Sequence, residues 1–225
     1  VVFGKRAGVL STLCHKPETI TFKSKSRVFI IPQRAFLSPL PPPEYIRSLS
    51  FKLKKGDSFD TTQIADKLTK LGYIRVPKVT VRGEFSLRGE VFDIFLPNDE
   101  HPCRGVFDFD ESESFKDFDP ENEVTLWKRD ELFIYPMKEV LWTDDFINNV
   151  KLKLDDYQNS ALNNDDDKFS EGNLSVHLPF TDEALKFKDN LLTELSTASE
   201  GEGEEFFYQL IWDKKYTFLD YIDST

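Results

Sequence analysis

The sequence has few cysteines and no long apolar run, and each shortage excludes a class of protein. Cys14 and Cys103 are the only cysteines among 225 residues, beside three scattered histidines. Two distant thiols make neither a disulfide framework nor a metal site, so we expect both to be reduced, as in a cytoplasmic protein. No stretch approaches the roughly 20 apolar residues of a membrane-spanning helix, and no membrane partner is expected.

Positive charge is also scarce. There are 29 Lys and Arg residues against 40 Asp and Glu, a net charge of -11. A surface of that charge repels phosphates, which excludes nucleic-acid binding by the whole surface and leaves open only a local basic patch. Aromatic residues reach 14%, enough large rings for a core. The chain begins at Val1 with no signal-peptide pattern, and we expect a fragment of a longer protein.

Prolines and glycines divide the chain. We expect a helix over 4–14, a buried strand over 27–32 and a short helix over 33–37. The proline-rich run 38–43 cannot continue a helix and predicts a stiff connector at a domain boundary. A strand is expected over 48–53. Asp60 then starts a helix that Gly72 ends.

Strand patterns dominate the centre of the chain, and helical patterns follow. Further strands are expected at 84–88, 91–96, 103–109, 113–118 and 131–135. After them we expect a helix over 144–163, a loop over 163–173, a short strand over 174–178 and a helix beginning after Thr181. The apolar stripe of this last helix is Ala184, Phe187, Leu191 and Leu195.

Arginines stand at or near the ends of the central strands. Arg82 precedes the first, Arg88 ends it, and Arg104 begins a later one. Each arginine has two interpretations: a solvated side chain, or a rigidly placed guanidinium that binds a partner carboxylate through two hydrogen bonds. If the strands are neighbours, the arginines form one patch, which would stand out in an acidic chain.

Motifs for catalysis are missing. Gly4-Lys5-Arg6 lacks the glycine spacing of a phosphate-binding loop, and neither a Gly-x-Ser-x-Gly elbow nor a His-Glu-x-x-His motif occurs. The carboxylates between 108 and 119 could suggest a cation site, but the outer face of a strand and its turn explains them more simply. We predict no catalytic and no metal-binding residue.

A series of motifs extends from Lys54 to Pro136. They include Leu71-Gly72-Tyr73, Gly83-Glu84-Phe85-x-x-Arg88-Gly89, Asp93-Ile94-Phe95-x-Pro97, Pro102-x-Arg104 and Phe118-Asp119-Pro120. The series resembles the N-terminal UvrB-like module of the bacterial transcription-repair coupling factor family. UvrB itself carries a similar segment.

The resemblance implies an α+β fold with a mainly β central subdomain, containing one helix, between partial pieces of a degenerate, P-loop-like α/β subdomain. It divides the chain into 1–48 for the end of the first α/β subdomain, 49–140 for the β-rich UvrA-docking subdomain and 141–225 for the returning α/β part. No catalysis and no cofactor are implied for this segment. ATP and magnesium would belong to motor domains elsewhere in a full-length DNA translocase, which would also contact RNA polymerase and double-stranded DNA.

The resemblance also assigns the partner-binding residues. Family arginines that contact UvrA correspond to Arg88 and Arg104. The family usually continues with two adjacent aromatics, whereas this chain reads Phe107-Asp108-Phe109. Asp108 therefore replaces the second aromatic, or Phe109 supplies it through a local shift. An aromatic anchor replaced by a carboxylate would weaken or re-specify docking.

The predicted function is a non-catalytic interaction segment that imitates UvrB and recruits UvrA in transcription-coupled nucleotide excision repair. One alternative is a fragment of UvrB, an ATP-dependent damage-recognition protein. UvrB has a tyrosine-rich DNA-binding hairpin, and the interval from Thr12 to Arg27 is too short and too polar to hold one. A structural β domain with solvated arginines is the other alternative.

Overall fold

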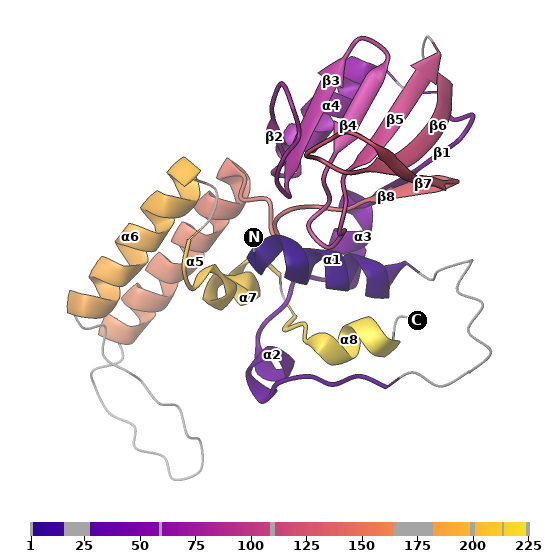
Figure 1. Ribbon diagram of the computed structural model, residues 1–225. Helices are drawn as coiled ribbons and strands as arrows, with labels where there is room; N and C mark the ends of the chain where they lie inside the picture. The colour runs from indigo at the N-terminus through magenta and orange to yellow at the C-terminus, as the bar shows by residue number, and fades with distance from the viewer. Residues whose placement is uncertain are drawn as a thin grey trace. The chain divides into compact units, whose positions relative to one another are not determined.

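The computed structural model describes residues 2–15, 28–58, 60–108, 111–163, 182–198, 201–212 and 214–223 (Figure 1). Its fold is α+β, as predicted. The chain forms two compact units. The first contains Val1–Leu37, Pro41–Leu141 and Thr217–Thr225, and the second contains Ser38–Leu40 and Trp142–Tyr216.

The first unit is built on two sheets. The larger has six strands in sequence order: β2 (Ile74–Arg75), β3 (Glu84–Arg88), β4 (Val91–Ile94), β5 (Cys103–Asp108), β6 (Glu111–Phe118) and β7 (Thr125–Arg129). Only the β2–β3 pair is parallel among these neighbours. The smaller sheet pairs β1 (Phe51–Lys54) with β8 (Glu131–Ile134).

A helix that follows β1 packs against these sheets. Helix α4 (Thr61–Lys70) starts at Asp60, whose carboxylate accepts hydrogen bonds from the first-turn backbone, and Gly72 follows its end with a φ of 91°. Both ends were predicted. The helix shares a core with the strands, which contains Ile64, Leu68, Phe85, Phe92, Phe107 and Phe115. The alternate residues of β3–β6 therefore face away from α4.

Four further helices belong to the first unit: α1 (Val2–Cys14), α2 (Gln33–Leu37), α3 (Pro43–Leu49) and α8 (Phe218–Asp223). Helix α1 packs against α3 and α8, and α2 packs against α8. The hydroxyl of Tyr221 in α8 donates a 2.7 Å hydrogen bond to the carbonyl of Pro41. This bond ties α8 to the segment that leads into α3.

Two expectations about this unit were wrong, and two of its strands were not predicted individually. Residues 28–32 form no strand, and Val28 and Ile30 are 85% and 95% exposed, because the run has no ladder partner among the described residues. Helix α3 occupies the end of the expected connector and the start of the strand expected over 48–53. Proline is tolerated in the first helical turn, where no intrahelical N–H bond is lost. Strands β2 and β7 were not predicted.

The second unit is helical among its described residues. It contains α5 (Asp144–Asn163), α6 (Asp182–Ala198), the 3₁₀ turn η1 (Glu204–Phe207) and α7 (Tyr208–Ile211). The buried carboxylate of Glu204 accepts hydrogen bonds from the Trp142 indole at 3.2 Å and the Tyr208 hydroxyl at 2.8 Å. None of the helices described here or in the first unit is long and apolar enough to cross a membrane.

Helix α5 has the bounds that were predicted, and α6 begins at Asp182, directly after the predicted cap residue Thr181. In α6, Leu191 and Leu195 are buried as expected. Ala184 and Phe187 are exposed, so the predicted stripe is wrong over its first half. The loop expected over 163–173 lies outside the described residues except for Asn163, which ends α5, and the strand expected over 174–178 and Thr181 lie outside them as well.

Candidate functional site

The candidate site lies on the face of the six-stranded sheet that points away from α4. Ser86 in β3 lies opposite Asp93 in β4, and Asp93 lies opposite Arg104 in β5. Directly paired residues share a face, so these three side chains form one row. Arg88, two residues after Ser86, shares the face with them. The predicted meeting of Arg88 and Arg104 on one patch is therefore what the structure shows, whereas Arg82 donates a hydrogen bond to the carbonyl of Asp99 and is not part of the Asp93 pairing.

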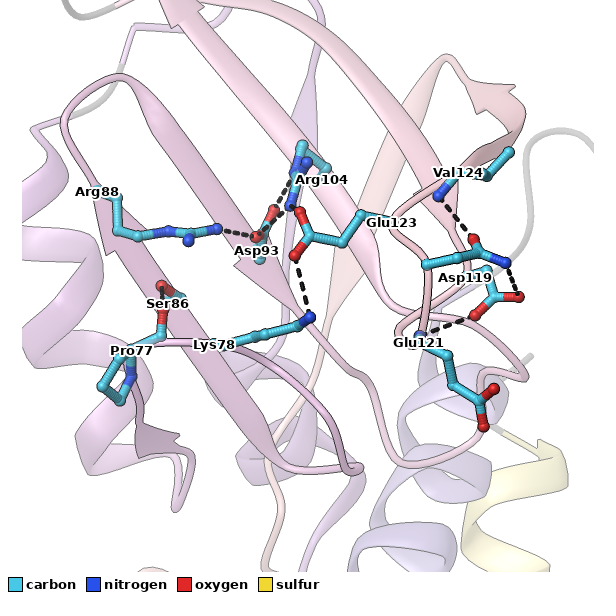
Figure 2. A network of polar contacts seen from close by, with 11 residues as sticks. Pro77, Lys78, Ser86, Arg88, Asp93, Arg104, Asp119, Glu121, Glu123 and Val124 are labelled. Carbon is cyan, nitrogen blue, oxygen red and sulfur yellow. Dashed lines mark hydrogen bonds and ion pairs between the residues drawn. The ribbon is translucent and has the colours of Figure 1, made fainter.

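Asp93 joins the two arginines. Its carboxylate accepts two hydrogen bonds from Arg104, at 2.7 Å from Nε and 2.9 Å from Nη2, and one of 3.0 Å from Arg88 Nη2 (Figure 2). The Asp93 side chain is 2% exposed, against 25% for Arg104 and 48% for Arg88. A buried carboxylate thus orients two guanidinium groups that still reach solvent.

A second carboxylate extends the network. Glu123 accepts a hydrogen bond from Arg104 Nη2 at 3.4 Å and pairs with Lys78 Nζ at 3.1 Å (Figure 2). Hydrogen bonds from Lys78 and Arg104 hold the pKa of Glu123 below its ordinary value. The guanidinium carbon of Arg104 lies over the Phe118 ring, 4.6 Å from its centroid, which is a cation–π contact.

The turn that carries Glu123 is fixed by its own hydrogen bonds. Asp119 accepts the backbone N–H of Glu121 at its carboxylate and that of Glu123 at its carbonyl, both at 2.8 Å. Glu123 itself has a φ of 59°, which is uncommon for a residue with a Cβ. The backbone of Glu123 is therefore strained in the turn conformation that places its carboxylate beside Arg104.

The two arginines differ in how their donors are used. The Arg104 guanidinium pairs with Asp93 and Glu123 and packs over the Phe118 ring. Its hydrogen bonds to Asp93 raise the pKa of Arg104. Arg88 makes one hydrogen bond with a described residue and its side chain is half-exposed, so four of its five N–H donors are not used by another described residue. Arg88 is consequently the arginine with capacity for a new carboxylate.

The remaining predicted contact residues lie at the end of β5. Alternation along the strand places Phe107 in the core, 1% exposed, so its ring is not offered at the surface. Asp108 is exposed, shares the Arg104 face and lies opposite Glu111. Phe109 lies outside the described residues.

Sequence reasoning did not assign a role to Asp93, which links the two arginines, or to Glu123, Lys78 and Phe118, which extend the network from Arg104. One signal was available, because an aspartate inside the apolar run Val91–Phe95 is unusual unless it is paired. The simple outer-face interpretation of the carboxylates was wrong for Asp117, which is fully buried and bonded to Arg129. Among described residues no cluster could hold a metal ion, and both cysteines are free and buried.

Comparison with known proteins identifies the segment that carries this site. Residues 51–140 match the UvrB interaction domain family. The wider chain is similar to the transcription-repair-coupling factor of Borreliella burgdorferi, with 28% identity over 194 residues that cover 84% of this chain and 14% of the relative. The same factor of Myxococcus xanthus is 34% identical over 116 residues, 52% of this chain and 10% of that protein.

UvrB is similar over a shorter stretch. The UvrABC system protein B of Kosmotoga olearia is 34% identical over 108 residues, 48% of this chain and 16% of the relative. The resemblance to the UvrB-like module of transcription-repair coupling factor is thereby confirmed, and the chain spans between 10% and 16% of the length of these three relatives. All members of the Asp93 network lie within residues 51–140, the segment that matches the UvrB interaction domain family.

Proposed function

We propose that the outer sheet face around Arg88, Asp93 and Arg104 docks a partner protein, and that the partner is UvrA. The observation that carries the proposal is the convergence of two arginines on one buried carboxylate. Asp93 fixes both guanidinium groups before a partner arrives, which lowers the entropy cost of binding. The location of the network within a UvrB interaction domain supports a protein partner.

The charges of the network suit an acidic partner surface. Lys78, Arg88 and Arg104 outnumber Asp93 and Glu123 by one, in a chain whose net charge is -11. A planar guanidinium binds a carboxylate through two parallel hydrogen bonds, which fixes direction as well as distance. Arg88, half-exposed at the end of β3, is the group that would make this contact.

The segment would serve recruitment rather than catalysis. In this proposal it imitates UvrB and brings UvrA to a stalled RNA polymerase for transcription-coupled nucleotide excision repair, in the cytoplasm. ATP hydrolysis with magnesium, translocation on double-stranded DNA and the polymerase contact would belong to other parts of a full-length protein. The match to Borreliella transcription-repair-coupling factor covers 84% of this chain, against 48% for UvrB, which favours the coupling factor over a UvrB fragment.

Calorimetric titration of UvrA into the chain tests the proposal. Arg88→Ala is expected to weaken binding by about 1–3 kcal/mol, the cost of losing one partner of a charged hydrogen-bonded pair. Lys70→Ala, on the exposed side of α4, removes a cation from the opposite face and is the control. Equal affinity of wild type and Arg88→Ala would refute the assignment of this arginine.

Asp108 gives a second variant for the same titration. Its exposed carboxylate stands where the family usually has an aromatic, on the face of Arg104. Asp108→Phe is expected to strengthen UvrA binding if the partner keeps an apolar pocket there. Weaker binding would instead show that the partner presents a cation to Asp108.

A further inference from the structure

A row of cations crosses the outer sheet face beyond the arginines. Arg104 in β5 lies directly opposite Lys116 in β6, and Lys116 lies directly opposite Lys128 in β7. Directly opposed residues share a face, with Cβ atoms about 5 Å apart. Lys116 is half-buried and Lys128 is exposed. The row thus runs from the Asp93 network to the β7 edge of the sheet.

Lys116 and Lys128 differ from the neighbouring arginines because neither pairs with a carboxylate of a described residue. Arg104 is neutralised by Asp93 and Glu123. On the opposite face, Arg129 pairs with two carboxylates, at 2.6 Å from Asp117 and 2.8 Å from Asp99. Within the described part of the chain, neither lysine lies within ion-pair distance of an acidic group.

Unneutralised lysines side by side have an energetic consequence. Like charges directly opposite on neighbouring strands destabilise a sheet, and the cost falls when an anion lies between them. Acidic residues are abundant in this chain, yet none of those described lies within ion-pair distance of the Lys116 or Lys128 amine. An acidic group from outside the chain would therefore be attracted to this position.

We propose that Lys116 and Lys128 extend the docking surface to the β7 edge and bind an acidic stretch of the partner protein. The inference rests on the proposed function, because it uses the same face and the same partner. Strands lie about 4.8 Å apart, so the row from Arg104 to Lys128 spans about 10 Å. A few residues of an extended acidic segment cover that length, at about 3.3 Å per residue.

A protein partner fits this row better than nucleic acid does. The carboxylates of Asp93 and Glu123 contact Arg104, Asp108 lies on the same face at the other end of β5, and all three would repel a continuous phosphate backbone. A protein segment can place its acids opposite the lysines alone. The chain's overall negative charge acts in the same direction.

The test compares two double variants in a titration with UvrA at low and at high salt. Lys116→Ala with Lys128→Ala is expected to weaken binding about tenfold and to make the affinity less dependent on salt. Lys55→Ala with Lys70→Ala removes two exposed lysines of the β1–α4 region and should leave both properties unchanged. Hydrogen exchange over β5–β7 checks that the variants remain folded.

Each outcome decides something. If Arg88→Ala weakens binding and the Lys116/Lys128 double variant does not, the extension is wrong and the proposed function stands. If neither changes the affinity, both are wrong. If the double variant keeps its affinity for UvrA but loses binding to a single-stranded oligonucleotide that the wild type binds, the row is a nucleic-acid surface and the inference is overturned.

Discussion

Arg88 and Arg104 contact the same carboxylate, but removing them should have unequal effects on stability. Arg104→Ala deletes two hydrogen bonds to a carboxylate that is 2% exposed, together with the contact over Phe118. Breaking a buried ion pair costs about 3–5 kcal/mol. Asp93 would keep Arg88, so we expect a loss of about 2–3 kcal/mol. Arg88→Ala deletes one hydrogen bond from a half-exposed side chain, worth about 0.5 kcal/mol.

Hydrogen exchange of the amides in β4 and β5 measures this difference locally, without assuming that the two units unfold together. Arg104→Ala should speed exchange about 30- to 160-fold, and Arg88→Ala about twofold. Lys70→Ala serves as the matched control, with wild-type exchange expected. Equal acceleration by the two arginine variants would refute the division into a structural arginine and a docking arginine.

Three further predictions concern the support of the site. Gly83→Ala should cost about 1–2 kcal/mol in denaturant unfolding, because Gly83 has a φ of 91° and a Cβ there would lie 2.7 Å from the Met137 terminal methyl; equal stability would contradict this. Arg129→Ala should cost about 3–5 kcal/mol in denaturant unfolding, because it leaves the fully buried carboxylate of Asp117 without its cation; equal stability of the variant and the wild type would refute the ion-pair explanation. Burial raises the pKa of the Cys103 thiol from 9.0 to about 12. At pH 8 this thiol should therefore react with a thiol reagent only on unfolding, and the stability that the buried neutral thiol contributes should decline as pH rises above 9.0. Rapid labelling of the folded chain would contradict this prediction.

Signals that act over a few residues, such as helix caps and strand alternation, predicted α4 and the strands β3 to β6. Asp60 and Gly72 mark the two ends of α4, because a side-chain cap and a left-handed residue act within a few positions of the helix. Strands β3 to β6 follow from alternation against a single core. Helix α5 was predicted with its observed bounds.

Elements that depend on distant partners were not predicted. Strand β7 lies at the edge of the sheet and pairs only with β6 among the described strands. Four of its five residues are exposed, so its sequence shows no alternation of apolar and polar residues. The apolar run 28–31 indicated a buried strand, yet apolar character does not supply a ladder partner. Arg88 and Arg104 were identified from their motifs, while Asp93 was missed because its role depends on the pairing of β3, β4 and β5.

The most direct measurement is site-specific photo-cross-linking to UvrA. A photoreactive residue at Ser114, on the outer face opposite Val106, is expected to cross-link to UvrA. The same residue at Lys70, on α4, should not, although that chain should bind UvrA with wild-type affinity. Cross-linking from Lys70 but not from Ser114, with binding intact in both, would contradict the claim that the Arg88–Asp93–Arg104 face is the docking surface.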